Sequence, residues 1–330
     1  MHLSIGEEYG KVTELVVCNF SVSQEDEEIK PPCCFVGYDS GVVVALTAVL
    51  SDGCTGYRFS FGRPQKSHTA RVSSMTILDC KPYDDHPGKI LMSACHGGQV
   101  YYYPNAMNPT RNYDMQSVLA FENENPDLCP LLSIASATLG KNHKKAILVC
   151  TGDRDGSMKL WLTSYDFLSK SKHASGDLFD QVKWYKSKAN QCVTVTKFIN
   201  SHSLVSGNVK GDIRLWEVES IAKSSEDESK VPGLTMRHLL KCAHNGPVET
   251  VTNIGDAVIT SGGNDGNLVG WDISTGQKIG TISCHYGQET FNESTGDKGV
   301  VHSCVVSNIV VDDRLISLCR DGILAQWVFC

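Results

Sequence analysis

One pattern of apolar and polar positions recurs six times along the chain. Each copy has two or three apolar residues, a small residue, a short turn that ends in Gly, and an alternating apolar strand. The copies read CFVGYDSGVVVAL, ILMSACHGGQVYYY, LVCTGDRDGSMKLW, LVSGNVKGDIRLW, VITSGGNDGNLVGW and LISLCRDGILAQW. The turn glycines are spaced by 57, 58, 55, 55 and 56 residues, at Gly41, Gly98, Gly156, Gly211, Gly266 and Gly322. A regular period over the whole chain indicates an array of repeated structural units.

Residue types at fixed places in the repeat predict a hairpin. Glycine ends each turn because a tight turn between two strands needs a residue that accepts positive φ. An Asp before it, at Asp155, Asp265 and Asp321, can bond its own backbone. Five residues after each glycine stands a large side chain: Leu46, Tyr103, Trp161, Trp216, Trp271 or Trp327. A large ring there is expected to seal each sheet against its neighbour and to bury about 150–250 Å².

Further apolar segments flank each hairpin. Upstream strands are predicted at ARVSSMTIL, PLLSIASATL, QCVTVTKFI, PVETVTNI and VVHSCVVSNIV, and weaker downstream strands at SVLAFE, MRHLLK and QKIGTIS. Four short strands per repeat, without a convincing amphipathic helix, are typical of propeller blades rather than βαβ units. The sequence therefore predicts an all-β propeller that spans residues 1–330 as a single domain.

The repeat resembles that of the WD40 family over essentially the whole chain. The fifth copy is nearest to the family pattern, with AHNGPVETV, then VITSGGNDG, then GWD. The resemblance implies a hydrogen-bonded tetrad of His244, Ser261, Asp265 and Trp271 that makes the blade rigid. Other copies keep only parts of this set, at Thr151, Asp155 and Trp161; Ser206 and Trp216, with Lys210 at the Asp position; Ser317, Asp321 and Trp327; His68, with Gly97 and Tyr103; and Ser40 with Leu46.

The number of blades and the closure of the ring follow from the count of repeats. Six blades are favoured, although seven remain possible if one blade is too degenerate to see. A six-bladed propeller left open for a partner's strand is a third alternative. In WD40 propellers an N-terminal strand completes the last blade and removes an exposed sheet edge. Residues 2–6 are expected to do this here.

Composition narrows the class of partner. Lys+Arg 30 against Asp+Glu 37 gives a net charge of −7, which argues against general nucleic-acid binding, since that needs clustered cations. The longest apolar run, residues 41–50, is about half of the roughly 20 residues that a spanning helix needs. No signal peptide is evident. The 14 scattered cysteines form no CxxC pair, so they are expected to be reduced inside the cell, in the cytoplasm, the nucleus or both.

No catalytic motif stands out. The chain has no GxSxG, HExxH, Walker-type loop or dinucleotide fingerprint. DRDGS at 153–157 resembles the start of a calcium loop, but the twelfth position is Ser164 rather than Glu. We therefore expect no enzyme activity, no cofactor and no metal. Polar insertions at 21–32, 168–177 and 220–233 read as surface loops, and phosphorylation at Ser224, Ser225 or Ser229 is an alternative role for the last of them.

The family resemblance also implies a docking rim on the narrower face of the propeller. Its residues come from the start of each first strand and from the position before the turn Asp. Carried onto this chain, they are Asp39, Arg71, Ser73, His96, Arg154, Val209, Pro247, Glu249, Asn264, Val300, His302 and Arg320. Three arginines and two histidines make this rim locally basic, and Arg is suited to carboxylate or phosphate.

These features favour a non-enzymatic interaction scaffold, a monomeric propeller within a complex of different proteins. Its rim is expected to bind an acidic or phosphorylated peptide segment of another protein. Two alternatives stay open: a propeller enzyme with its active site in the channel, and a propeller that recognises a histone tail or RNA.

Overall fold

A computed structural model describes most of the chain. The described residues are 7–18, 33–50, 57–79, 89–104, 115–123, 130–139, 146–164, 180–186, 191–219, 233–283, 288–291, 298–301, 304–311, 314–320 and 324–328. Their contacts separate them into two compact units. The first unit comprises the described residues of 1–151 and 159–182, and the second those of 152–158 and 183–330. The prediction of one domain over residues 1–330 stays a prediction.

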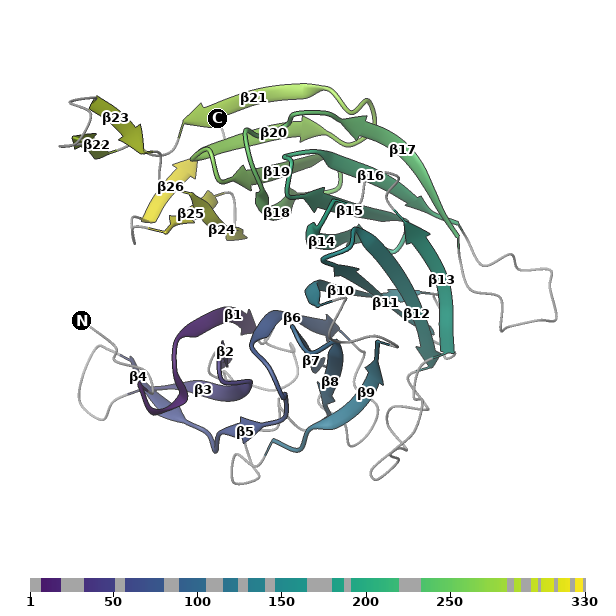
Figure 1. Cartoon of the computed structure of the whole chain (residues 1–330), viewed down its shortest axis with the longest axis vertical. Helices are drawn as coiled ribbons and strands as arrows, with labels where there is room; N and C mark the ends of the chain where they lie inside the picture. The colour runs from purple at the N-terminus through teal and green to yellow at the C-terminus, as the bar shows by residue number, and fades with distance from the viewer. Residues whose placement is uncertain are drawn as a thin grey trace. The chain divides into compact units, whose positions relative to one another are not determined.

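The first unit holds two antiparallel sheets and most of a third (Figure 1). Sheet 1 has the order β1 (Val12–Cys18), β2 (Cys33–Tyr38), β3 (Val42–Leu50) and β4 (Tyr57–Phe61), and the short β5 (Gln65–Lys66) also pairs with β3. Sheet 2 has the order β6 (Val72–Asp79), β7 (Lys89–Cys95), β8 (Gln99–Tyr103) and β9 (Val118–Glu122). Sheet 3 has the order β10 (Leu131–Leu139), β11 (Ala146–Asp153), β12 (Ser157–Ser164) and β13 (Asp180–Lys186). A single 3-10 turn, Glu7–Tyr9, precedes β1.

The second unit holds three further sheets and a small hairpin. Sheet 4 has the order β14 (Val193–Asn200), β15 (Ser203–Asn208), β16 (Ile213–Val218) and β17 (Leu234–Leu240). Sheet 5 has the order β18 (Val248–Ile254), β19 (Val258–Gly263), β20 (Asn267–Asp272) and β21 (Lys278–Ser283). Sheet 6 has three described strands, β24 (Val305–Val311), β25 (Arg314–Cys319) and β26 (Leu324–Val328). A separate hairpin of β22 (Gln288–Phe291) and β23 (Lys298–Val301) comes before it.

Each of the six sheets is ordered as a propeller blade, with its strands side by side in chain order. The predicted all-β class with six blades is confirmed. The fourth strand of sheet 3 is β13, which contains the segment VKWYK. Residues 2–6 lie outside the described part of the chain, so closure by that segment stays a prediction. No helix among the described residues is long and apolar enough to cross a membrane.

The repeated turns have the geometry that the glycines predicted. Five of the six turn glycines are described and all have positive φ, between 74° at Gly266 and 88° at Gly156. Close packing adds a second requirement at Gly156, because a Cβ there would lie 2.6 Å from the carbonyl oxygen of Gln191. The hairpin between the second and third strands therefore recurs with the same local conformation.

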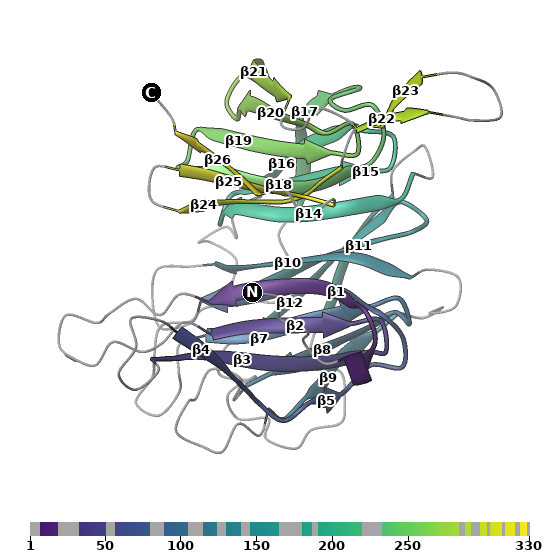
Figure 2. The ribbon, with the colours of Figure 1, turned by 90° about the vertical axis from the view of Figure 1, so that its left-hand side faces the viewer.

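The core lies in the seams between neighbouring sheets. Within the first unit, β1 packs on β6 and β6 on β10, and within the second unit β14 packs on β18 and β18 on β24 (Figures 1 and 2). One apolar cluster joins sheets 2 and 3 and includes Trp161, which stacks on Phe121 with ring centroids 3.8 Å apart. Another joins sheets 4 and 5 and includes Trp271. Both faces of a blade are thus buried where a neighbouring sheet packs against each of them.

Candidate functional site

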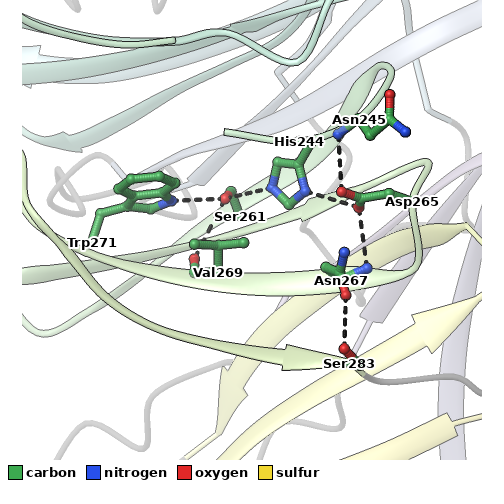
Figure 3. A network of polar contacts seen from close by, with 8 residues as sticks. All are labelled: His244, Asn245, Ser261, Asp265, Asn267, Val269, Trp271 and Ser283. Atoms are coloured by element: carbon green, nitrogen blue, oxygen red, sulfur yellow. Dashed lines mark hydrogen bonds and ion pairs between the residues drawn. The ribbon is translucent and has the colours of Figure 1, made fainter. Parts of the chain in front are cut away.

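Sheet 5 contains a continuous chain of polar contacts (Figure 3). The indole Nε1 of Trp271 donates to Ser261 Oγ at 3.0 Å, and Ser261 Oγ lies 2.8 Å from His244 Nε2. The other ring nitrogen, His244 Nδ1, lies 3.0 Å from Asp265 Oδ1. Asp265 also accepts the backbone amide of Asn245 at 3.0 Å. The set joins the segment before β18 to both strands of the hairpin β19–β20.

The hydrogen-bond donors and acceptors of this tetrad fit together in only one order when His244 is neutral. The indole N–H can only donate, so Ser261 accepts it and donates its own hydrogen to His244 Nε2. Nδ1–H of His244 then donates to Asp265. Burial alone would raise the pKa of Asp265, but hydrogen bonds from His244, from the Asn245 amide and from Asn267 hold it well below its usual range. Asp265 therefore stays a carboxylate that fixes the loop before β18.

Parts of the same hydrogen-bond network recur in the other sheets. A hydroxyl ten residues before the ring position contacts the ring in four more sheets, at Ser93–Tyr103 (3.1 Å), Thr151–Trp161 (3.1 Å), Ser206–Trp216 (2.9 Å) and Ser317–Trp327 (3.0 Å). In sheet 1 the same two positions are Val36 and Leu46, which are both buried in one apolar cluster. The ring position therefore has a structural role in each of the six sheets: its side chain is buried in sheets 1, 2, 3 and 5 and half-buried at Trp216 and Trp327.

Sheet 2 keeps the histidine but lacks the acid. His68 Nε2 lies 2.6 Å from Ser93 Oγ, and His68 is 2% exposed. Gly97 stands where sheet 5 has Asp265, and among the described residues no group hydrogen-bonds His68 Nδ1. Burial lowers the pKa of His68 to about 4. This histidine is a neutral core residue, which agrees with the structural role expected for it.

A recurring backbone contact joins the two kinds of position from which the rim residues were predicted. The residue before the turn Asp position donates its amide to the carbonyl of the residue just before the first strand, over 2.9–3.1 Å. The pairs are Asp39 to Lys11, His96 to Arg71, Val209 to Cys192, Asn264 to Pro247, and Arg320 to Cys304. The two kinds of rim position therefore lie side by side in five sheets.

A β-bulge recurs next to this contact. The register of the first strand slips between Val12 and Glu14, Val72 and Ser74, Val193 and Val195, Val248 and Thr250, and Val305 and Ser307. The extra residue of a bulge is left out of the ladder and its side chain is re-aimed. Ser73 and Glu249, two of the predicted rim residues, are bulge residues. Ser73 Oγ donates to the carbonyl of Ala94 at 3.2 Å.

The structure distributes the predicted rim residues between the two units. In the first unit lie Asp39, Arg71, Ser73 and His96. In the second lie Arg154, Val209, Pro247, Glu249, Asn264 and Arg320. Arg154 and Asn264 are exposed, and Val209 is 37% exposed. Asp39 is engaged by the N-terminal segment, because its Oδ1 accepts the amide of Lys11 at 2.9 Å.

Two predicted rim positions in the sixth repeat need correction. The sequence predicts that the first strand starts at the apolar pair containing Val300, but Val300 belongs to β23 of the separate hairpin. The first strand of sheet 6 begins at Val305, and Cys304 makes the recurring contact with Arg320. Cys304 and the bulge residue Val306 therefore hold the two positions predicted for Val300 and His302. His302 lies outside the described residues.

Glu249, Cys304 and Arg320 form a polar cluster at the seam of sheets 5 and 6. Arg320 Nη2 lies 4.0 Å from Glu249 Oε1, and their side chains are 65% and 28% exposed. Burial raises the pKa of Glu249, while Arg320 and a hydrogen bond from the Cys304 thiol oppose the rise. Burial and the charge of Glu249 raise the pKa of Cys304 to about 11, so it is a thiol at neutral pH. The exposed guanidinium of Arg320 is the part of the cluster that can meet a ligand.

Sequence reasoning missed an acid in the first unit. Burial raises the pKa of Glu14 to about 8, against the opposing charge of Arg71. Glu14 follows the bulge of β1 and so falls one residue outside the rim pattern. A charged residue within the apolar run VTELVVC was the available signal. Among the described residues, no three His, Cys, Asp or Glu side chains gather closely enough to hold a metal ion.

Comparisons with known proteins place the fold. No family model and no curated protein matches the chain. Among solved structures, Sqt1 of Chaetomium thermophilum, bound to the N-terminus of ribosomal protein L10, superposes with a TM-score of 0.55 at 17% identity, over 93% of this chain and 73% of that one. Raptor of the same organism superposes with a TM-score of 0.58 at 12% identity, over 96% of this chain and 24% of that one. A chain of the mitotic checkpoint complex gives 0.54 at 15%, over 90% of this chain and 73% of that one.

The blade order and these likenesses define the class: the chain folds as a WD40-type β-propeller. The resemblance to the WD40 repeat is confirmed at the level of the fold. Identities below 20% show the fold and carry no partner or activity across to this chain.

Proposed function

We propose that this protein is a non-enzymatic scaffold that docks segments of other proteins on its rim. The rim of the second unit is the docking surface, and an acidic or phosphorylated peptide is its ligand. The protein acts inside the cell, in the cytoplasm or the nucleus, as one subunit of a complex.

One observation carries the proposal. Arg320 is held at a rim position by the recurring backbone contact with Cys304, yet its guanidinium is 65% exposed and 4.0 Å from the nearest carboxylate oxygen of Glu249. At that distance the ion pair is loose, so the guanidinium keeps most of its donors for a ligand. Arg donates in a planar fork that matches carboxylate or phosphate oxygens. Arg154, at the equivalent turn position of sheet 3, is also exposed.

The solved structures with a similar fold support, in general terms, a role in binding segments of other proteins. The Sqt1 structure contains the N-terminus of a ribosomal protein, and another likeness is part of a checkpoint complex. Repeat proteins commonly place their binding residues on the loops of one face. Of the predicted rim residues in the second unit, Arg154, Val209, Asn264 and Arg320 lie in turns, which supports the proposal.

Charge reversal at the rim tests the proposal. We would replace Arg154 and Arg320 together by Glu in the full chain and compare its co-purifying proteins with those of the unchanged protein. The purified proteins would also be applied to an array of acidic, phosphorylated and neutral peptides. Loss of the acidic or phosphorylated binders is expected. Lys278→Glu makes the same kind of charge change at an exposed site on β21 and should leave binding intact. An unchanged partner list for the double variant would refute the proposal.

A further inference from the structure

The segment before β6 leaves one buried polar atom of sheet 2 without a hydrogen bond. His68 is 2% exposed; its Nε2 lies 2.6 Å from Ser93 Oγ, which lies 3.1 Å from the Tyr103 hydroxyl. The other ring nitrogen, Nδ1, is buried and has no hydrogen-bond partner among the described residues. When Tyr103 donates to Ser93 and Ser93 donates to Nε2, in the order found in sheet 5, Nδ1 carries a hydrogen that nothing accepts. A buried donor without an acceptor is costly, so this atom favours any acceptor that can reach it.

Sheet 5 shows which acceptor belongs at this position. There His244 Nδ1 lies 3.0 Å from Asp265 Oδ1, and Asp265 Oδ2 accepts the backbone amide of Asn245 at 3.0 Å (Figure 3). One carboxylate therefore takes two donors from the segment before β18, one with each oxygen. The same segment in sheet 2 can be compared with it residue by residue.

Sheet 2 keeps both donors but not the acid. His68 and Thr69 lie four and three residues before β6, as the histidine and asparagine of sheet 5 lie before β18. Gly97 stands one residue before the turn glycine, where sheet 5 has its aspartate. A Cβ built on Gly97 would lie 2.9 Å from Thr69 Oγ1, 3.4 Å from Cys95 Sγ and 3.5 Å from Ala70 Cβ, so these atoms border the position of the missing acid. Sheet 2 thus has the two donors of a carboxylate site without its carboxylate.

No described group of this chain brings a negative charge to this position. The Thr69 amide is held only by Gln99 Oε1 at 3.4 Å, which is longer than the 3.0 Å of the equivalent contact in sheet 5. Burial raises the pKa of Cys95, so its thiol is neutral at neutral pH and supplies no charge. Glu122 pairs with Gln99 across β8 and β9 but makes no hydrogen bond with His68 Nδ1. The acid that would complete the set is therefore absent from the described part of the chain.

The position of the missing acid lies at the surface of sheet 2 rather than in its core. Thr69 is exposed, and Gly97 and Gln99 are half-buried. The side chains of Thr69 and Gln99 meet over 3.1 Å between Oγ1 and Oε1, a contact between two neutral groups. A carboxylate that takes the Thr69 amide from Gln99 replaces a neutral acceptor by a charged one, and charge-assisted hydrogen bonds are roughly twice as strong as neutral ones. An acid from outside the chain can therefore compete for this amide.

We propose that sheet 2 binds one carboxylate side chain, of an Asp or a Glu in another polypeptide, at the position of the missing acid. One carboxylate oxygen accepts the hydrogen of His68 Nδ1 and the other accepts the Thr69 amide, while the side chains of Thr69 and Gln99 rotate to admit it. The incoming acid completes between two molecules the set that Asp265 completes within sheet 5. A phosphate group fits less well, because it would bring two charges to a place where burial penalises charge. The site lies in the first unit and does not rest on the docking surface proposed for the second.

NMR titration of the histidine rings of the full chain tests this site. The histidines carry nitrogen-15 in the ring, the buffer contains no carboxylate, and the His68 signals are identified by their loss in His68→Gln. The probes are acetate and the blocked tripeptide Gly-Asp-Gly; chloride at equal ionic strength and blocked Gly-Asn-Gly are their controls. Acetate and Gly-Asp-Gly should shift the His68 signals saturably and raise the pKa of His68 by about 1 or more, because a nearby negative charge favours the protonated ring. Chloride and Gly-Asn-Gly should do neither.

Two further controls separate the site from general effects of the probes. His244, whose Nδ1 already has its acid, should respond to neither probe. Gly97→Asp supplies an acid from within the chain and should abolish the response of His68, and a thermal melt checks that this variant is folded. The assignment is overturned if neither probe shifts His68 saturably, if His68 and His244 respond equally, or if acetate acts and Gly-Asp-Gly does not. A His68 pKa of about 6.5 or above without any probe also overturns it, because the ring would then not lack an acceptor. Replacing Arg154 and Arg320 by Glu should leave these signals unchanged, so this site and the proposed function fail separately.

Discussion

The side chain of Val305 lies against the backbone of Gly262. A Cβ built on that glycine would be 2.7 Å from Val305 Cγ1 and 2.8 Å from Thr250 Cγ2. Val305 is 0% exposed there, in one cluster with Leu268 and Leu315. The absence of a side chain at one position of β19 therefore sets how closely sheets 5 and 6 approach.

This contact predicts unequal effects of substitution at two equivalent positions. Gly262→Val would force β24 away from β19 and should lower the free energy of unfolding by about 2–3 kcal/mol, as for overpacked cores. Leu318→Ala, at the equivalent position of sheet 6, removes a side chain that is 38% exposed and should cost less than about 1 kcal/mol. Denaturant unfolding of both variants provides the measurement. Equal losses would contradict the packing described for sheets 5 and 6.

The tetrad of sheet 5 predicts that Asp265, which belongs to it, stabilises the fold more than Asp272, which follows Trp271, does. Asp265→Ala leaves the buried ring of His244 and the Asn245 amide without their acceptor, so a loss of about 1–3 kcal/mol is expected. Asp272→Ala removes only solvent-exposed contacts to Ser274 and Thr275, so its loss of stability should be smaller than that of Asp265→Ala. Thermal melts at neutral pH compare the two variants. A larger loss for Asp272→Ala would show that the tetrad does not hold the blade.

The repeat spacing was sufficient to predict the six sheets and their turns. Each hairpin is local, and its glycine and ring positions depend only on residues within about ten positions. The positive φ of Gly156 and the hydrogen bond from Trp271 to Ser261 follow from that local pattern. Features that depend on the exact register of strand pairing could not be found in this way. The bulge that re-aims Glu249 depends on how β18 pairs with β19.

The sixth repeat shows where apolar patterning misleads. Val300 and Val305 both lie in apolar segments, and only the pairing with β25 shows that the blade starts at Val305. Leu268 and Leu324 are the same residue at the same repeat position, yet one is 1% and the other 65% exposed. Burial is set by what packs on the sheet, which a periodic sequence does not specify.

The buried histidine of sheet 2 predicts a pH-dependent stability. Above pH 6.5 His68 is neutral whether folded or unfolded, so it adds no pH dependence. Between pH 6.5 and about 4 the unfolded chain takes up a proton that the folded chain excludes, and the free energy of unfolding falls by about 3 kcal/mol. Comparison with His68→Gln isolates this contribution, because glutamine does not titrate. If both proteins lose stability in parallel over this range, His68 is not the group responsible.

Restoring the missing acid of sheet 2 gives a complementary prediction. Gly97 occupies the position of Asp265, so Gly97→Asp should place a carboxylate beside His68 Nδ1, which no described residue hydrogen-bonds. The new Cβ would lie 2.9 Å from Thr69 Oγ1, the end of an exposed side chain that can rotate. We expect about 1 kcal/mol of added stability at pH 7 and a His68 pKa well above its present value of about 4. NMR titration of the histidine rings measures the pKa. Gly97→Ala adds the same Cβ without an acceptor. If His68 has the same pKa in Gly97→Ala and Gly97→Asp, the carboxylate does not reach the ring.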